Sequence, residues 1–251
     1  MHTFALVTSA PGEHFRTGFA GEAMLSVLRH WPLEDVWFHT YASDSEAVSE
    51  GLKHRVMLKT PPGLLEFRHS YGLDCQKASN QGDGYDYKFD AVRFAAKAYC
   101  LWDAANRTVQ DSIIWLDSDV VTHTKVPLAL LFDLRDAGDV VVLDRKSYGL
   151  ECGFVMYNRD AGKRLLTDFY RLYSEATLFA CKEWHDSYLL GRLIQDGGYK
   201  VHNLADGIEG KHPWPKPVLG SFMPHYKGPA RKDARKDLSD DEAEGYGLVD
   251  A

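Results

Sequence analysis

The chain has 251 residues, 45% of them apolar, and a formal net charge of −7, which suits one α/β domain with a sizeable core. This acidic balance argues against a general nucleic-acid binder, because phosphate contacts need clustered lysine and arginine. The sequence shows no apolar stretch long enough for a transmembrane segment, no signal-peptide pattern in MHTFALVTSA and no CxxC spacing among its four cysteines. We therefore expect a cytoplasmic protein with reduced core thiols.

Strands and helices are expected to alternate along the chain. Short apolar runs predict strands at residues 3–8, 36–41, 55–58, 113–116, 139–143, 152–157 and 199–204. Apolar residues at helical spacing predict helices at residues 18–29, 86–106, 162–176 and 187–195, with a short polar helix between the second and third strands. This alternation indicates a mostly parallel α/β sheet, with ligand chemistry at the carboxyl ends of the strands.

Two segments lack this periodicity. Residues 59–85 contain two prolines and four glycines with few periodic apolar positions, which predicts a long loop, and loops of that length are often functional. After Gly207 the composition shifts to proline, glycine and mixed charge, and the stretch RKDARKDLSDDEAEGYG is expected to be a solvated tail.

The segment IIWLDSDVVTH, residues 113–123, places two aspartates at the end of an apolar strand. A turn explains one aspartate there, but both flanks of Asp117 and Asp119 look buried, and a buried carboxylate is costly unless it is compensated. One functional interpretation is a DxD metal site. In such a site the carboxylates bind Mn²⁺ or Mg²⁺, and the metal bridges to the diphosphate of a nucleotide-sugar.

The competing interpretation is the phosphoaspartyl motif of haloacid-dehalogenase-like phosphatases, with Asp117 as nucleophile and Asp119 as general acid/base. That motif normally lies on the first strand of its domain, whereas three expected strands precede it here. The only later pair of adjacent aspartates, Asp240 and Asp241, lies in the polar tail. These observations favour the DxD interpretation and leave the phosphatase as an alternative.

Four separated pieces of the sequence carry a family resemblance. They are ALVTSAPGEHFRTGFAGEAMLSVLRH (residues 5–30), the DSD triplet, ECGFVMYN followed by EWHDSYLLGRL (residues 151–158 and 183–193), and HYKGPARK (residues 225–232). Together they resemble the retaining GT-A glycosyltransferases related to glycogenin and the bacterial lipopolysaccharide galactosyltransferases. The resemblance implies the GT-A fold, an α/β fold in which a single Rossmann-like, mostly parallel central sheet has helices on both faces.

The resemblance also implies a binding site for a UDP-sugar. The first strand end and its loop, Thr8, Ser9 and Phe15, would hold the uracil, with the ring of Phe15 as a stacking platform. The other donor-binding residues by the same resemblance are Ser118, Gly153, Gly228, Arg231 and Lys232.

A basic residue in the helix before the DSD triplet would reach the phosphates or the sugar of the donor. Both Arg93 and Lys97 qualify, and the sequence does not decide between them. With Asp86 and Asp90 they also fit a surface ion-pair face of that helix, because all four lie at i,i+3 or i,i+4 spacing.

The metal ligands implied by the resemblance come from both ends of the chain. Asp117 would contact the ribose and the metal, and Asp119 and His225 would ligate Mn²⁺ or Mg²⁺. His225 and Gly228 match the family's HxxGxxK element, in which the following cation, here Arg231 or Lys232, neutralises the diphosphate. His123 matches no family ligand and is interpreted as structural or as a support for the site.

Asp186 falls on the aspartate of the family's DQxxLN element, which lies near the anomeric carbon of the sugar as a nucleophile or as a stabiliser of positive charge. The catalytic residues implied are therefore Asp186, Asp117 and Asp119. This sequence departs from the family pattern at two positions that would contact the donor. Glu151 stands where Asn is usual, and Ser187 stands where Gln is usual. Asp186 also fits a helix N-cap, because Asp is a favoured cap residue.

The sequence therefore predicts a metal-dependent, retaining glycosyltransferase that uses a UDP-sugar. Residues 1–227 would form its GT-A domain, and residues 228–251 a basic, then acidic, tail whose start closes over the diphosphate. The acceptor is open among saccharides, proteins, lipid-linked sugars and modified nucleic-acid bases, and the predicted 59–85 loop is expected to shape its side of the site. A non-catalytic relative that binds nucleotide-sugars is a further alternative, and the oligomeric state is not predicted.

Overall fold

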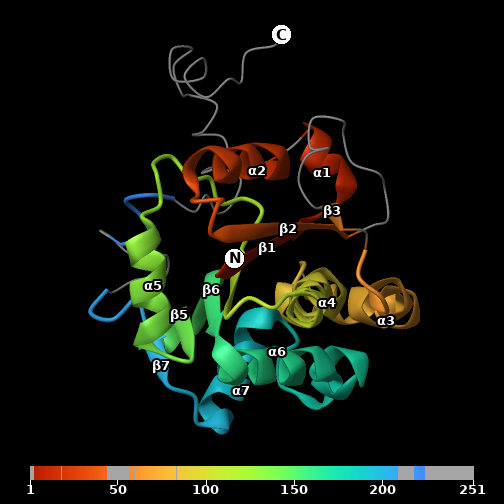
Figure 1. Ribbon diagram of the computed structural model, residues 1–251. Helices are drawn as coiled ribbons and strands as arrows, with labels where there is room; N and C mark the ends of the chain where they lie inside the picture. Colours follow the sequence, from red (N-terminus) through yellow and green to blue (C-terminus); the bar gives the residue numbers. More distant parts are fainter. Residues whose placement is uncertain are drawn as a thin grey trace.

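The computed structural model describes residues 3–17, 19–43, 57–58, 60–82, 84–208 and 218–223. Its centre is a seven-stranded sheet with the strand order β3-β2-β1-β4-β6-β5-β7 (Figure 1). The strands are β1 Phe4–Ala10, β2 Val36–Ala42, β3 Met57–Leu58, β4 Ser112–Leu116, β5 Val140–Asp144, β6 Leu150–Asn158 and β7 Val201–Asn203. The helices are α1 Gly12–Thr17, α2 Phe19–His30, α3 Leu64–Ser79, α4 Ala91–Arg107, α5 Leu128–Ala137, α6 Arg159–Ser174 and α7 Asp186–Gly197.

The sheet is mostly parallel, as predicted. Only β6 runs against its neighbours, β4 and β5, while the other four strand pairs are parallel. The carboxyl ends of β1, β4 and β5 therefore share one edge of the sheet with the first residues of β6. In the β4–β6 register Leu116 faces Phe154, so the residues that follow β4 meet the start of β6 at this edge.

Helices cover both faces of the sheet, which confirms the predicted arrangement (Figure 1). Successive strand residues point to opposite faces, and β1 shows the result. Phe4 and Leu6 pack in one apolar cluster with α2 and α5, whereas Ala5 and Val7 pack in a second cluster with α3, α4, α6 and α7. These two clusters are the core of the protein, and they hold the carboxyl edge of the sheet in place from both sides.

The prediction of a long loop at residues 59–85 is wrong, because α3 occupies Leu64–Ser79. Its buried positions, Leu64, Phe67, Cys75 and Ser79, recur at helical spacing and pack on the core. The polar residues between them and Gly72 diluted this pattern in the sequence. Gly63 precedes the helix in a left-handed conformation with φ +81°, which glycine adopts without strain.

The predicted helix at residues 86–106 begins later than expected. Tyr87–Phe89 form a 3-10 turn, and α4 starts at Ala91. Asp86 accepts a hydrogen bond from the Lys88 backbone N–H, and Asp90 accepts one from the Arg93 backbone N–H. The two aspartates therefore cap turns and do not form the ion-pair face that their spacing suggested.

Two further helices, α1 and α5, were not predicted. The ten residues of α5 follow Pro127 and bury Leu131 and Leu134, but the run LALLF has too little polar contrast to reveal its period. The short helix expected between the second and third strands lies outside the described residues, as do the domain boundary at residue 227 and the tail. Within the described ranges, no helix is long and apolar enough to cross a membrane.

Candidate functional site

A buried lysine joins three segments at the carboxyl edge of the sheet. Lys97 lies in the second turn of α4, and its side chain is 8% exposed. Its ammonium lies 2.5 Å from Asp186 Oδ2 at the start of α7 and 3.1 Å from Asp117 Oδ1 just after β4. It also donates to the carbonyl of Cys152 in β6, at 2.9 Å. We call Lys97, Asp117 and Asp186 the lysine cluster.

Asp117 is held by two further hydrogen bonds, one to its carboxylate and one from its backbone. The indole Nε1 of Trp115 donates to Asp117 Oδ1 at 2.6 Å, and the Asp117 backbone N–H donates to the Gly153 carbonyl at 2.8 Å. The ring of Trp115 also lies 5.0 Å from the Lys97 ammonium, within cation–π range. Trp115 and Asp117 are two residues apart, so both side chains project from the α4 face of the strand.

Charge explains why a lysine is stable here. Burial alone would lower the pKa of Lys97, but the carboxylates of Asp117 and Asp186 together outweigh burial and raise that pKa well above its usual value. The lysine therefore stays protonated. One ammonium faces two carboxylates in the cluster, and Asp119 adds a third carboxylate nearby in sequence, which favours the binding of a further cation.

The DSD turn is anchored by apolar residues on its carboxyl side. Val120 and Val121 are 0% and 4% exposed, and the Val120 N–H donates to the Asp117 carbonyl at 3.0 Å. Asp117, Ser118 and Asp119 remain partly exposed. The buried flanks inferred from the sequence are therefore present, and they present the two aspartates at the surface of the sheet edge.

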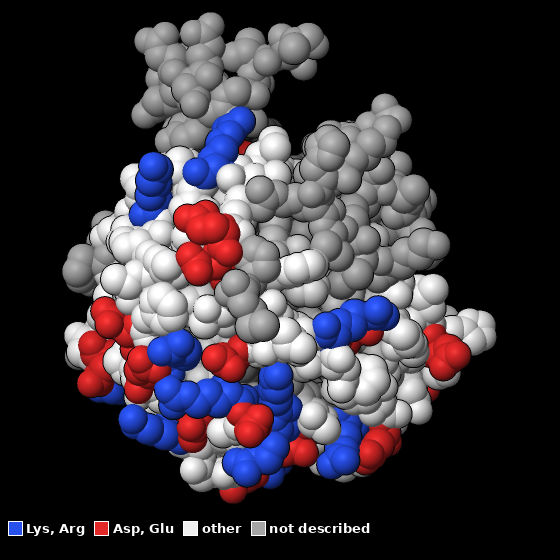
Figure 2. All heavy atoms as spheres, viewed as in Figure 1, with Lys and Arg blue, Asp and Glu red and all other residues white. Residues whose placement is uncertain are grey.

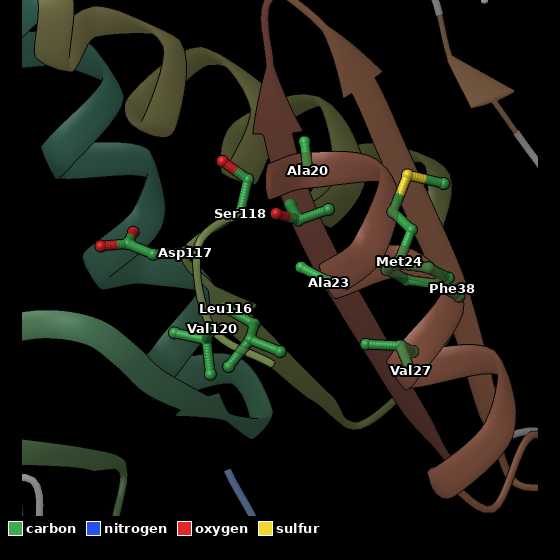
Figure 3. Close-up of a pocket in the computed structure, with 10 residues that line it drawn as sticks. Ala20, Ala23, Met24, Val27, Phe38, Leu116, Asp117, Ser118 and Val120 are labelled. Carbon is green, nitrogen blue, oxygen red and sulfur yellow. The ribbon is translucent and has the colours of Figure 1, made fainter. Parts of the chain in front are cut away.

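A pocket opens beside this turn, on the face of the sheet that α2 covers (Figure 3). It encloses about 210 Å³, part of it open to solvent. The apolar lining consists of Ala20, Ala23, Met24, Val27, Phe38, Leu116 and Val120, and the polar lining of Thr8, Asp117 and Ser118. In Figure 3 the Asp117 carboxylate points away from the α2 side chains, so the turn separates the pocket from the lysine cluster.

Thr8 supplies a polar atom to this pocket. Its side chain is 4% exposed, and its hydroxyl has no hydrogen-bond partner among the residues that the structure describes. A buried hydroxyl without a partner destabilises the folded state unless a ligand completes it. An apolar slot with hydroxyl groups in its lining suits a flat heterocycle such as a nucleobase.

Two residues expected near the base have other contacts. Ser9 is partly exposed and its side chain hydrogen-bonds with Cys100. Phe15 is 3% exposed and packs in the apolar cluster of α2 and α5, so its ring is a core side chain and presents no open face for stacking. The sequence could not separate these roles, because a core aromatic and a platform aromatic have the same local pattern.

The structure separates Arg93 from Lys97. Arg93 is exposed on the first turn of α4, where its guanidinium lies 3.5 Å from the Tyr85 hydroxyl. Lys97, one turn further along the helix, makes the contacts to Asp117 and Asp186. Of the two basic residues, Lys97 therefore belongs to the interior of the site and Arg93 to its rim.

Asp186 is the first residue of α7 and is 5% exposed. The cap position is His185, which makes no side-chain cap hydrogen bond, so capping is not the role of Asp186. While Oδ2 contacts Lys97, Oδ1 accepts from the Ser187 backbone N–H at 2.8 Å and lies 3.4 Å from the Ser187 hydroxyl. Ser187, one of the two departures, thus supports the aspartate.

Glu151 is the other residue that departs from the family pattern, and its buried carboxylate also has partners. It is 3% exposed, lies 3.4 Å from the Arg145 guanidinium and accepts from the Gly153 backbone N–H at 3.2 Å. Sequence reasoning missed Trp115 and Arg145. The period of two along β4 could have pointed to Trp115, but only the pairing of β5 with β6 brings Arg145 to Glu151.

The third expected metal ligand lies outside the described residues. His225, Gly228, Arg231 and Lys232 all belong to that part of the chain, so the structure does not place them. Within the described ranges, no group of three or more histidine, cysteine, aspartate or glutamate side chains is arranged to hold a metal ion. His123 is partly buried, and its backbone N–H donates to the Phe222 carbonyl, as expected for a structural residue.

Comparison with known proteins identifies the fold. No family model and no curated protein matches the sequence. The structure resembles galactosyltransferase LgtC, solved with donor and acceptor sugar analogues, with a TM-score of 0.53 and 14% identity over 98% of this chain and 96% of that one. It also resembles the glycosyltransferase GlyE of Streptococcus pneumoniae TIGR4, with a TM-score of 0.50 and 15% identity over 100% of this chain and 61% of that one. The chain therefore has a GT-A glycosyltransferase-like fold.

Proposed function

We propose that this protein is a metal-dependent glycosyltransferase that transfers the sugar of a UDP-sugar to an acceptor hydroxyl with retention of anomeric configuration. One observation carries the proposal. The DSD turn and Asp186, far apart in the sequence, are joined through Lys97 at the carboxyl edge of a GT-A-like sheet. Open α/β sheets bind their ligands at this edge.

The acidic turn fits a hard divalent cation. Asp117 and Asp119 offer carboxylate oxygens, which Mn²⁺ and Mg²⁺ prefer, and both side chains are partly exposed. His225 is the proposed third ligand. When bound, the metal supplies positive charge that stabilises the departing diphosphate. Arg231 and Lys232 are proposed to add positive charge on the same group.

The pocket beside α2 suits the base of the donor. Thr8 has a buried hydroxyl that can donate to or accept from a base edge, and the apolar side chains of α2 provide a dry wall. Ser118 lines this pocket and directly precedes Asp119 in the sequence, so it suits contact with the ribose or the phosphates. The DSD turn would then separate the base from the sugar.

The lysine cluster suits the sugar. Lys97 and Ser187 hold the two oxygens of Asp186, so this carboxylate has a fixed orientation before substrate binds. A carboxylate held in this way stabilises positive charge that develops on the anomeric carbon as the diphosphate leaves. Because Ser187 preserves this orientation, the departures from the family pattern give no reason to favour a non-catalytic relative.

The fold does not support the phosphatase alternative. Asp117 follows the central strand of a GT-A-like sheet, and its Oδ1 is already bonded to Trp115 and close to Lys97. We therefore carry the glycosyltransferase alone as the proposed function.

The test is release of UDP from a panel of UDP-sugars, with Mn²⁺, with Mg²⁺ and with a chelator. We expect slow metal-dependent UDP release from one sugar, since water can replace the acceptor. A parallel assay with p-nitrophenyl phosphate measures phosphatase activity. Hydrolysis of that compound without UDP release from any donor would overturn the proposal.

A further inference from the structure

Two exposed tyrosines border the outer end of the lysine cluster. Tyr85 and Tyr87 precede α4 and are 51% and 47% exposed. The ring of Tyr87 lies 5.3 Å from that of His185 in edge-to-face contact and 6.5 Å from that of Phe94. Large aromatic side chains that remain exposed beside a site commonly mark a surface that a ligand covers.

This aromatic surface is continuous with the lysine cluster. His185 immediately precedes Asp186, and Arg93 lies one turn before Lys97 on α4. The hydrogen bond with Tyr85 raises the pKa of Arg93, and the carboxylates of Asp90 and Asp186 raise it further against the effect of burial. A ligand on the tyrosines therefore lies next to the carboxylate that faces the donor sugar in the proposed function.

The tyrosines are held before any ligand binds. The Tyr85 hydroxyl donates to Asp90 Oδ2 at 2.6 Å, and Asp90 Oδ1 accepts from the Arg93 backbone N–H at 3.2 Å. On the other side, His185 Nε2 lies 2.9 Å from Glu183 Oε2. Side chains fixed in this way lose little entropy when a ligand binds.

The side chains of this aromatic surface indicate which class of ligand it binds. Aromatic faces pack against the C–H faces of a sugar ring, while carboxylates and a guanidinium bond its hydroxyl groups. Asp90, Glu183 and Asp186 would repel the phosphates of a nucleic acid. On the face of the molecule seen in Figure 2, most basic side chains lie next to acidic ones.

A peptide acceptor fits this surface less well. The described residues here belong to a 3-10 turn and to the starts of α4 and α7, so they offer side chains and no strand edge to a peptide main chain. A neutral saccharide needs no such edge.

We propose that Tyr85, Tyr87 and Arg93 form the acceptor subsite and that the acceptor is a neutral saccharide whose ring stacks on Tyr87. This rests on the proposed function. In the transfer, the acceptor hydroxyl oxygen bonds to the anomeric carbon of the donor. The bond from that carbon to the diphosphate oxygen breaks with its electron pair, and the hydroxyl proton passes to the released diphosphate.

The first experiment measures UDP release with Mn²⁺ and the active donor, with and without possible acceptors. The saccharide probes are methyl α- and β-glucoside, methyl β-galactoside, methyl α-mannoside, lactose and maltose. The other probes are a single-stranded oligonucleotide and a tyrosine-containing peptide. We expect at least one saccharide to raise the rate severalfold over hydrolysis. A panel in which no saccharide does so overturns the assignment, and so does stimulation by the peptide or the oligonucleotide alone.

The second experiment compares Tyr87→Ala with Trp37→Ala. Trp37 is 41% exposed near the amino end of β2, far along the strand from the carboxyl edge, and serves as a matched control. We expect the ratio of saccharide-stimulated to unstimulated rate to fall at least tenfold in Tyr87→Ala and to stay unchanged in Trp37→Ala. An unchanged ratio in Tyr87→Ala would overturn the subsite.

Saturation-transfer NMR with the same saccharides separates this inference from the proposed function. It detects saccharide binding without donor turnover. If the wild type binds a saccharide, Tyr87→Ala does not, and no donor is cleaved, the proposed function fails while the subsite stands. If donors are cleaved but saccharide signals are equal in both proteins, the subsite fails while the proposed function stands.

Discussion

Lys97 and Asp186 form a buried ion pair of 2.5 Å, although 89 positions separate them in the sequence. The pair joins α4 to α7 across the carboxyl edge of the sheet, and Asp117 approaches the same ammonium from β4. A buried lysine held by two carboxylates stabilises their close approach, which would otherwise be repulsive. The structure of the site therefore depends on this lysine.

Replacing Lys97 by Met should lower the free energy of unfolding by about 3–5 kcal/mol, because it leaves buried carboxylates without their counter-charge. Urea unfolding measures this loss. Lys88→Met is the control, since its ion pair with Glu183 is partly exposed at 3.5 Å and such pairs contribute about 1 kcal/mol or less. Equal losses in the two variants would contradict the account.

The combination of Lys97→Met with Asp186→Asn should cost less than the sum of the two single changes. The asparagine removes one of the charges that the missing lysine leaves uncompensated. A double-mutant cycle by urea unfolding measures the coupling. Additive losses would mean that the ion pair contributes nothing beyond packing.

Under the proposed function, Trp115→Phe should weaken metal-dependent activity by about 10–100-fold, which is the usual effect of removing a group that orients a metal ligand. The change removes the hydrogen bond to Asp117 Oδ1 but keeps an aromatic ring near Lys97. The measurement is UDP release against Mn²⁺ concentration, together with Mn²⁺ binding by calorimetry. Trp102→Phe, at a ring stacked on Tyr170, should behave as the wild type. A wild-type Mn²⁺ titration of Trp115→Phe would refute the role.

Thr8→Val should raise the free energy of unfolding by about 1 kcal/mol and weaken UDP binding. Valine has the same shape and removes a buried hydroxyl that lacks a partner among the described residues. Thr122→Val should have the opposite effect on stability, because the Thr122 hydroxyl accepts from Trp31 Nε1 at 3.1 Å. Thermal unfolding and calorimetry with UDP check the two parts. Destabilisation by Thr8→Val would show that its hydroxyl is bonded in the folded protein.

His39 should make the fold sensitive to acid. Burial lowers the pKa of His39 to about 4, with the Asp103 carboxylate opposing this effect and the Arg107 cation adding to it. Below pH 6.5 the unfolded chain binds a proton here that the folded chain does not. The free energy of unfolding should therefore fall by about 3 kcal/mol through this group between pH 6.5 and pH 4, and no further below.

His39→Leu should remove this part of the pH dependence, and His69→Leu, at an exposed position on α3, is its control. Urea unfolding at several pH values gives the slope for each protein. A His39→Leu slope equal to that of the wild type would refute the role of His39.

Much of the fold could be predicted because it follows from local patterns of apolar residues in the sequence. The strand before Asp117 and the buried valines after Asp119 were readable from apolar runs, and they led to the DSD turn as the site. The weak periodicity of α3 hid a helix, because Gly72 and polar neighbours masked four buried positions.

The partners within the site could not be predicted in the same way. Arg93 and Lys97 lie on the same side of one helix, and local spacing cannot tell which of them is buried. The contacts of Lys97 to Asp117 and Asp186 arise only when β4, β6 and α7 meet at one edge. Phe15 was expected in a loop beside the base of the donor, but its side chain is buried in the core.

The most direct test of the central claim is the initial rate of UDP release with Mn²⁺ in Asp186→Asn and Asp196→Asn. Both residues lie on α7, but Asp196 has a side chain that is 71% exposed and forms only a 3.7 Å pair with Arg192. With folding verified by urea unfolding, Asp186→Asn should lose at least a hundredfold in rate and Asp196→Asn should match the wild type. A rate in Asp186→Asn equal to that of the wild type would contradict the assignment of sugar chemistry to the lysine cluster.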